Sequence, residues 1–188
     1  MKNYKYLTTF MLFSFVLFCS CNSSFKNETE SNTIDTLLAR KITFPTKLSY
    51  LKSNSFYPID TLLTRFESEI KVISIVDGSC MKCITNQINR LDSLFTMEFQ
   101  NFNDTKLIFV LNVSMYDSSF FMRNLYPEIR TSGALLWDNS YHFERENRLF
   151  TQNEYLRTFM VDAENRIVVY GNPLMNPELL DEYKKRFN

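Results

Sequence analysis

The chain has 188 residues, of which 45% are hydrophobic and 15% aromatic, so it can bury a core and is not a disordered chain. Its 21 basic and 21 acidic residues balance, which argues against nucleic acid as a partner. Three glycines argue against a glycine-rich phosphate-binding loop, and a single histidine excludes a histidine-rich metal site, so we expect no cofactor and no metal.

The first 20 residues have the pattern of a bacterial export signal. Two lysines precede the apolar run FMLFSFVLF at 10–18, which is shorter than the ~20 residues that a membrane-spanning helix needs. Cys19-Ser20-Cys21 follows and resembles the lipobox of bacterial lipoproteins, in which a small residue precedes the lipid-modified cysteine. We therefore expect cleavage before Cys21 and lipidation of Cys21. An ordinary cleaved signal peptide without a lipid is the alternative.

Composition divides the remaining chain into three parts. Residues 21–35 are polar and are expected to form a flexible tether, residues 36–70 an N-terminal elaboration, and residues 71–188 the main folded domain. We expect an exported protein, anchored by lipid to a bacterial membrane and facing the periplasm or the cell surface. Such a compartment is oxidising and permits disulfides. With the signal removed and Cys21 lipidated, Cys80 and Cys83 are the only free thiols.

Hydrophobic periodicity predicts alternating strands and helices in the folded part. Residues 42–51 indicate an irregular strand and turn, and residues 61–66 a short helix. KVISIV at 71–76 and LIFVLNV at 107–113 are typical of buried strands. Between them, a helix of about four turns is predicted because apolar residues recur at helical spacing, namely Ile84, Ile88, Leu91 and Phe95.

The last third of the chain predicts smaller elements. In chain order these are a short helix at 118–126 that Pro127 stops, a strand at 134–137, two strands at 157–161 and 166–170 joined by the hairpin signal DAEN, and a final helix capped by Asn176. The charged run at 142–146 is expected to leave His142 exposed, and Trp137 is expected in the core. The whole predicts an α/β fold with a mixed central sheet and helices on both faces.

Cys80 and Cys83 stand where the first buried strand gives way to the long helix. The first turn of a helix presents unpaired N–H groups and the positive end of the helix dipole, so the pKa of Cys80 should fall below the ~8.5 of a free thiol. Lys82 adds a positive charge, whereas Asp77 acts in the opposite direction. Cys83 lies about one turn deeper and is expected to be the more sheltered of the two. This spacing predicts attack by Cys80 and resolution of the mixed disulfide by Cys83.

Other uses of the pair fit the sequence less well. A zinc site needs about four ligands, and covalent haem attachment needs a histidine after the second cysteine, where Ile84 stands. A purely structural disulfide between residues three apart constrains little, so an inert pair stays an alternative.

Three strings resemble the thioredoxin-like superfamily, more narrowly its exported redoxin and TlpA-like lipoproteins: KVISIVDGSCMKCI at 71–84, LIFVLNV, and TFMVDAENRIVVYGNP at 158–173. The resemblance implies a thioredoxin-like domain over 71–188 and thiol–disulfide oxidoreductase activity. It also implies Cys80 as the nucleophile and Cys83 as the resolving cysteine, with protein thiols or disulfides and a redox partner protein as partners.

Three positions depart from that family. Ser79 stands where an aromatic residue is usual, and Ser74 where many members carry a buried acid that relays a proton. The family's cis-proline corresponds to Leu156 or Arg157, and a non-proline cis bond costs ~2.5–4 kcal/mol. Arg157 directed at Cys80 would favour the thiolate, and a solvated arginine at a strand edge is the alternative. The expected lining of the site is therefore Ser79, Lys82, Leu156 and Arg157.

These observations support a membrane-tethered thiol–disulfide oxidoreductase that exchanges disulfides with exported proteins. The alternative is a non-catalytic lipoprotein that uses the fold as a binding module. A peroxidase is a third hypothesis, but the threonine that peroxiredoxins carry three residues before the reactive cysteine is Asp77 here.

Overall fold

The computed structural model describes residues 36–66, 69–99, 106–150 and 153–187. The predicted export signal, Cys21 and the predicted tether at 21–35 lie outside these ranges. The chain divides into two units, residues 1–37 and residues 38–188, and the second unit contains all the strands of the described ranges. No helix among the described residues is long and apolar enough to cross a membrane.

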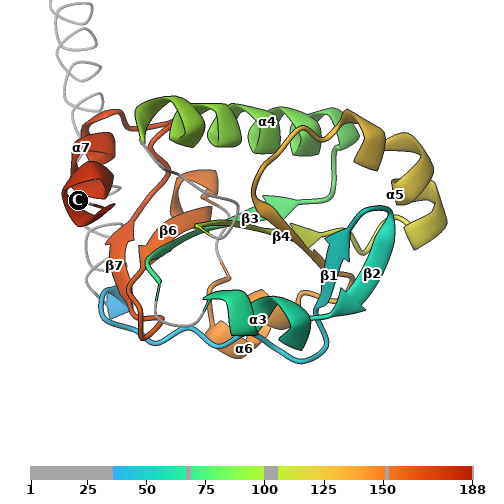
Figure 1. Ribbon diagram of the computed structural model, residues 1–188, viewed down its shortest axis with the longest axis horizontal. Helices are drawn as coiled ribbons and strands as arrows, with labels where there is room; N and C mark the ends of the chain where they lie inside the picture. Colours follow the sequence, from blue (N-terminus) through green and yellow to red (C-terminus); the bar gives the residue numbers. More distant parts are fainter. Residues whose placement is uncertain (1–35, 67–68, 100–105, 151–152, 188) are drawn as a thin grey trace, which may run out of the picture. The chain divides into compact units, whose positions relative to one another are not determined.

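Within the described ranges, the second unit is built on a seven-stranded sheet with the order β2-β1-β5-β4-β3-β6-β7 (Figure 1). The strands are β1 (Ser49–Lys52), β2 (Ser55–Pro58), β3 (Lys71–Asp77), β4 (Leu107–Asn112), β5 (Ala134–Asp138), β6 (Thr158–Val161) and β7 (Ile167–Tyr170). Strands β3, β4 and β5 run parallel, and the two hairpins β1–β2 and β6–β7 join them antiparallel. The predicted mixed sheet is confirmed.

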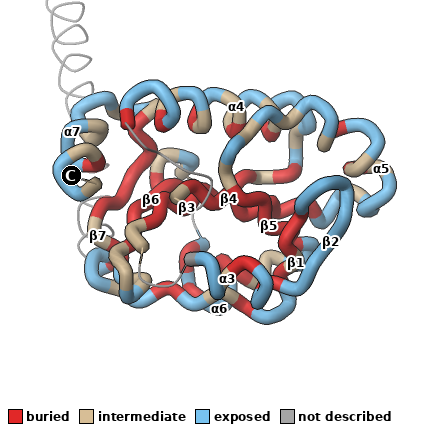
Figure 2. Tube along the Cα trace, in the orientation of Figure 1, coloured by how far each residue is buried: buried red, intermediate tan, exposed pale blue. Residues whose placement is uncertain are grey.

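Helices cover both faces of this sheet. They are α3 (Asp60–Phe66), α4 (Met81–Glu98), α5 (Ser118–Asn124), α6 (His142–Asn147) and α7 (Glu178–Phe187), with two 3₁₀ turns, η1 (Tyr126–Glu128) and η2 (Glu154–Arg157). Helices α4, α5 and α7 lie on one face, and α3 and α6 on the other (Figure 1). The central strands are the buried part of the chain, whereas β2 is exposed along its length (Figure 2).

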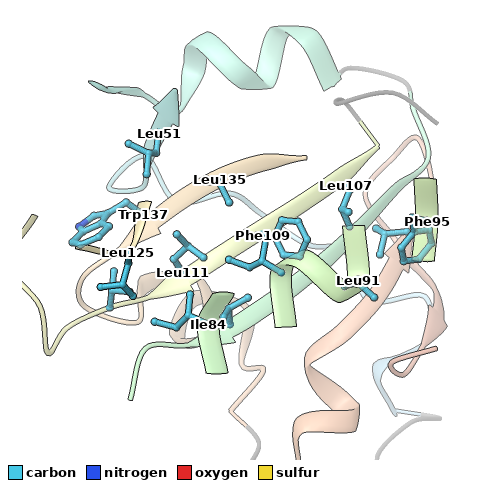
Figure 3. Packing of buried hydrophobic residues seen from close by; sticks show 14 of the residues in the cluster. Leu51, Ile84, Leu91, Phe95, Leu107, Phe109, Leu111, Leu125, Leu135 and Trp137 are labelled. Atoms are coloured by element: carbon cyan, nitrogen blue, oxygen red, sulfur yellow. The ribbon is translucent and has the colours of Figure 1, made fainter. Parts of the chain in front are cut away.

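The central strands are continuous apolar runs because helices cover both of their faces. Every residue of β4 is buried, as is every residue of β3 except Asp77. Helix α4 packs the predicted stripe against them, and Ile84, Leu91 and Phe95 point toward β4 in Figure 3. Each of these side chains is fully buried, which contributes roughly 1.5–3 kcal/mol per residue. This packing fixes where α4 begins relative to the end of β3.

The predicted hairpin and the final helix are also confirmed. Strands β6 and β7 pair antiparallel around a turn in which Asn165 has a left-handed φ of 63°. Asn176 Oδ1 accepts the backbone N–H of Glu178 at 3.1 Å, as expected of a capping residue. Trp137 is 8% exposed and lies in the core, in edge contact with Phe121.

Two elements differ from the prediction. Residues 49–58 form a regular hairpin, in which Tyr50 pairs with Leu136 of β5 and extends the sheet. Helix α6 was not predicted at all. His142, at its first residue, is half-buried rather than exposed, because Asp138 Oδ1 accepts its backbone N–H at 3.0 Å and ties the helix to the end of β5.

Candidate redox site

Cys80 caps the N-terminus of α4. Its backbone is extended, with φ −137° and ψ 113°, and the helix begins at Met81. Cys80 Sγ accepts the backbone N–H of Cys83 at 3.3 Å, which is one of the unpaired donors of the first turn. The two cysteines form a disulfide with their Cα atoms 5.2 Å apart. The predicted placement of the pair at the strand-to-helix junction is therefore confirmed.

The two cysteines differ in exposure, in the order opposite to the one expected. Cys80 is half-buried and Cys83 is exposed, so the expectation that Cys83 is the more sheltered was wrong. The helix geometry explains the difference. Cys80 lies four residues before Ile84 and shares its buried face, whereas Cys83 lies one residue before Ile84 and is rotated away from the sheet.

Gly78 brings the turn before Cys80 against β4. Its N–H donates to the carbonyl oxygen of Asn112 at 2.7 Å. A Cβ at this position would lie 2.1 Å from the same oxygen and 2.8 Å from Val113 Cα, both of them backbone atoms. Only glycine fits this close approach, so the position of the turn depends on it.

Asp77 and Arg157 form an ion pair beside the cysteine loop. Arg157 Nη1 donates to Asp77 Oδ2 at 3.0 Å, and Ser79 N–H donates to Asp77 Oδ1 at 2.9 Å. Burial would raise the pKa of Asp77, but the Ser79 N–H and the Arg157 guanidinium outweigh it and hold this pKa below its usual value. The Arg157 side chain is 12% exposed, so the alternative of a solvated arginine was wrong. Its charge offsets the Asp77 carboxylate that opposes a thiolate at Cys80.

The other expected site residues take varied positions. Ser79 and Lys82 are exposed beside the cysteines, whereas Leu156 is buried at 4% exposure in η2. No cis peptide bond occurs in the described ranges, which include Leu156 and Arg157. Ser74 is buried and its hydroxyl lies 3.0 Å from that of Thr158. The position at which the sequence resemblance implies a buried acid therefore holds a serine that is hydrogen-bonded to Thr158.

A row of polar residues that was not predicted from the sequence ends the three parallel strands. Asp77 at the end of β3 pairs in register with Asn112 of β4, which pairs with Asp138 of β5. Glu144 of α6 lies against this row, 2% exposed, and accepts a hydrogen bond from Asn112 Nδ2 at 2.5 Å. Burial raises the pKa of Glu144, although Arg157 and the bond from Asn112 act in the opposite direction. A signal was present in the sequence, since Asp77 and Asp138 directly follow two predicted strands and Asn112 is the one polar residue near the end of the predicted strand at 107–113.

A cleft lies at the same edge of the sheet, beyond β5. It has a volume of about 310 Å³ and is lined by Lys47, Ser49, Phe56, Tyr116, Asp117, Ser118, Trp137 and Asn139. Tyr116 and Asn139 follow the carboxyl ends of β4 and β5, as the cysteine loop follows that of β3. The aromatic part of its lining comes from Phe56, Tyr116 and Trp137.

Solved structures share this architecture at low sequence identity. A candidate thiol:disulfide interchange protein DsbE from Chlorobium tepidum matches with a TM-score of 0.53 and 10% identity, over 80% of this chain and 98% of that chain. A candidate thiol-disulfide oxidoreductase from Bacteroides vulgatus matches with a TM-score of 0.52 and 12% identity, over 79% and 91%. A mutant of PrxQ from Xylella fastidiosa matches with a TM-score of 0.52 and 11% identity, over 80% and 97%.

The sequence itself matches no protein-family model and no curated protein. At these identities the structural likeness shows the fold. The chain therefore has a thioredoxin-like α/β fold, as the sequence resemblance implied.

Proposed function

We propose that this protein is a thiol–disulfide oxidoreductase that exchanges disulfides with exported proteins through Cys80 and Cys83. The observation that carries the proposal is the placement of the disulfide. It lies at the N-cap of a long helix, and Cys80 Sγ accepts the Cys83 N–H. The same donor stabilises a Cys80 thiolate once the disulfide is reduced. Neither cysteine is buried, so a partner sulfur has access to the pair.

The exchange proceeds in two displacements. The Cys80 thiolate attacks one sulfur of a substrate disulfide, the substrate S–S bond breaks, and the departing sulfur takes a proton from solvent. Cys83 then loses its proton to the second departing sulfur and attacks Cys80, which closes the Cys80–Cys83 disulfide. Two electrons pass from the cysteine pair to the substrate. Oxidation of a substrate dithiol is the same sequence in reverse.

The roles of the two cysteines follow from the helix terminus. Attack requires a thiolate, and the N-cap position of Cys80 is where the backbone stabilises one. Cys83 is more exposed, but its sulfur is not placed at the cap. We therefore assign attack to Cys80 and resolution to Cys83.

We further propose that a lipid on Cys21 tethers the protein to a bacterial membrane, facing the periplasm or the cell surface. This part rests on the lipobox-like sequence and on the polar segment at 21–35. Metabolic labelling with a fatty acid tests it. Incorporation that Cys21→Ala abolishes supports the tether, and labelling of neither protein contradicts it.

Trapping of mixed disulfides tests the activity. Cys83→Ser should accumulate disulfide-linked complexes with exported proteins that a reductant releases, because the second displacement cannot occur. Cys80→Ser and the double variant should trap far less. Reduction of a disulfide-bonded polypeptide such as insulin by the wild type, coupled to dithiothreitol, is the second readout. If Cys83→Ser traps nothing and the wild type reduces insulin no faster than the double variant does, the fold serves as a binding module and the proposal fails.

A further inference from the structure

Glu144 is buried beside Asn112, whose side-chain oxygen lacks a hydrogen-bond donor among the described residues, and an ionised carboxylate cannot supply one. It is 2% exposed, and one of its oxygens lies 2.5 Å from Asn112 Nδ2. Asn112 is 1% exposed, and its Oδ1 has no hydrogen-bond partner within the described part of the chain. A buried polar atom without a partner costs roughly 1–3 kcal/mol, so the pair calls for one more donor.

A proton on Glu144 supplies that donor. A carboxylate can only accept hydrogen bonds, whereas a carboxylic acid donates through one oxygen and accepts through the other. The neutral acid can therefore donate to Asn112 Oδ1 and accept from Asn112 Nδ2 in one closed pair. If the amide lies the other way round, its oxygen faces Glu144 at the 2.5 Å distance and again requires a shared proton. With the amide as placed, the bond from Nδ2 by itself favours the carboxylate, whereas the Oδ1 that lacks a partner in the described ranges favours the acid; with the amide reversed, the short contact favours the acid.

The neighbouring carboxylates also raise the pKa of Glu144, whereas Arg157 lowers it. Asp77 and Asp138, at the ends of β3 and β5, carry like charges that raise the pKa of Glu144 in addition to the larger effect of burial. Tyr170 of β7 is neutral, because burial raises its pKa to about 12. Arg157 is the cation that lowers the pKa of Glu144. The remaining charged or titratable groups on α6 itself are His142, Arg145 and Glu146, and Arg145 bonds to His142 Nδ1 at 2.9 Å.

Two contacts join this pair to the cysteine loop. The backbone oxygen of Asn112 accepts the Gly78 N–H at 2.7 Å, two residues before Cys80. Arg157, whose charge acts on Glu144, bonds to Asp77, which in turn accepts the Ser79 N–H. A new negative charge at Cys80 therefore arises next to groups that already interact with Glu144.

We propose that Glu144 is a redox-linked proton carrier that, with Asn112, holds a proton more tightly when the Cys80–Cys83 disulfide is reduced. It is a positioning residue, since it acts through Asn112, Arg157 and Asp77. The inference rests on the proposed function only in requiring that the pair can be reduced and reoxidised. Position 74 of β3, where we looked for a buried acid, holds a serine. The proposal assigns the proton-holding role to Glu144 of α6.

The step balances with a dithiol as the reductant. The dithiol transfers two electrons to the disulfide and becomes a disulfide itself. The products at the site are a Cys80 thiolate and a Cys83 thiol, and one of the two dithiol protons is left over. Over the pH range between the pKa values of Glu144 in the oxidised and the reduced protein, the Glu144 carboxylate takes up that proton.

The test is the pH dependence of the equilibrium between the intact protein and the dithiothreitol couple. Each additional proton taken up per two electrons changes the equilibrium constant up to tenfold per pH unit, which is about 30 mV. The wild type should show an added steep segment in this dependence, and Glu144→Gln should lack it. Glu146→Gln is the matched control, because Glu146 is exposed on the same helix, and it should behave as the wild type does. Equal slopes for the wild type and Glu144→Gln would overturn the proposal.

A measurement on the unmodified side chain guards against a misfolded variant. Carbon-13 NMR of the Glu144 carboxyl, followed against pH in the oxidised and the reduced protein, should give an inflection that moves upward on reduction. An inflection that does not move contradicts the proposal even if the variant unfolds. Failure of the proposed function is separate, because a protein that traps no substrate can still show the Glu144-dependent slope, and an active oxidoreductase can lack it.

Discussion

Arg157 Nη1 lies 3.0 Å from Asp77 Oδ2, and this bond joins η2 to the end of β3 immediately before the cysteine loop. Asp77 stands three residues before Cys80, the cysteine that we propose reacts as a thiolate, and its negative charge would oppose that thiolate. With Arg157 paired to it, the carboxylate adds little negative potential at Cys80. The ion pair thus reduces the effect of the Asp77 charge on the pKa of Cys80.

The first prediction concerns this ion pair. Arg157→Gln should raise the pKa of the Cys80 thiol by several tenths of a unit, because a partly exposed charge pair is worth up to ~1 kcal/mol and one pKa unit equals ~1.4 kcal/mol. Asp77→Asn should lower it, and the double variant should lie near the wild type. The pH dependence of the alkylation rate measures the shift. Arg90→Gln, at an exposed position of α4, is the control. An Arg157→Gln profile that overlays the wild-type profile would remove the electrostatic role.

The second prediction concerns the helix N-cap. In the reduced wild type, Cys80 should be alkylated with an inflection below pH ~7.5, the upper end for activated cysteines, because the Cys83 N–H and the helix dipole stabilise its thiolate. Cys83 should react with an inflection near that of a free thiol. Peptide mapping after brief iodoacetamide pulses at several pH values distinguishes the two sulfurs. The reverse order of the two inflections would assign attack to Cys83.

The third prediction concerns the close approach at Gly78. Gly78→Ala should lower the free energy of unfolding by ~1–3 kcal/mol, the usual cost of overpacking. The new Cβ meets backbone atoms, which cannot rotate away. Urea unfolding measures the free energy. Ser79→Ala is the neighbouring control and should change it by less than ~0.5 kcal/mol, since the Ser79 side chain is exposed. A Gly78→Ala protein as stable as the control would show that the turn can move off β4.

The fourth prediction concerns the pH dependence of stability. The folded-state pKa of Glu144 lies above its unfolded value of ~4.3, so between the two values the native state binds more protons than the unfolded state does. The Glu144 contribution is fully present below pH ~4.3 and is lost as the pH rises through the folded-state pKa. The stability of Glu144→Gln relative to the wild type should therefore increase with pH across this window. Urea unfolding at a series of pH values measures it, and parallel curves for the two proteins would contradict the raised pKa.

Much of the fold could be predicted because its central elements carry their signal locally. Strands β3 and β4 are apolar runs, and α4 repeats its buried residues at helical spacing. The β1–β2 hairpin was harder, since its regular geometry depends on pairing with β5, about 85 residues further along the chain. Helix α6 spans six residues that include three charged ones, and its start depends on Asp138 rather than on apolar periodicity.

The sequence predicted the two sulfur atoms and part of the lining, but not the buried acid on α6. The cysteine spacing and the preceding strand were enough to place the disulfide at a helix terminus. The burial of Glu144 was not visible, because a glutamate in a charged run is ordinarily exposed and only the register of β3, β4 and β5 brings Asn112 against it. The exposure of Cys83 depends on how α4 is rotated about its axis, and the buried residues that α4 packs against the sheet determine that rotation.

The bond between Asp77 and Arg157 spans 80 positions of the chain. A ribosome synthesises proteins from the N-terminus, so Cys80 and Cys83 emerge well before the arginine that balances the neighbouring carboxylate. Strand β6, which follows Arg157 directly, is also the antiparallel neighbour of β3. The growing polypeptide therefore carries its two sulfurs without the charge that balances Asp77 until Arg157 has been added.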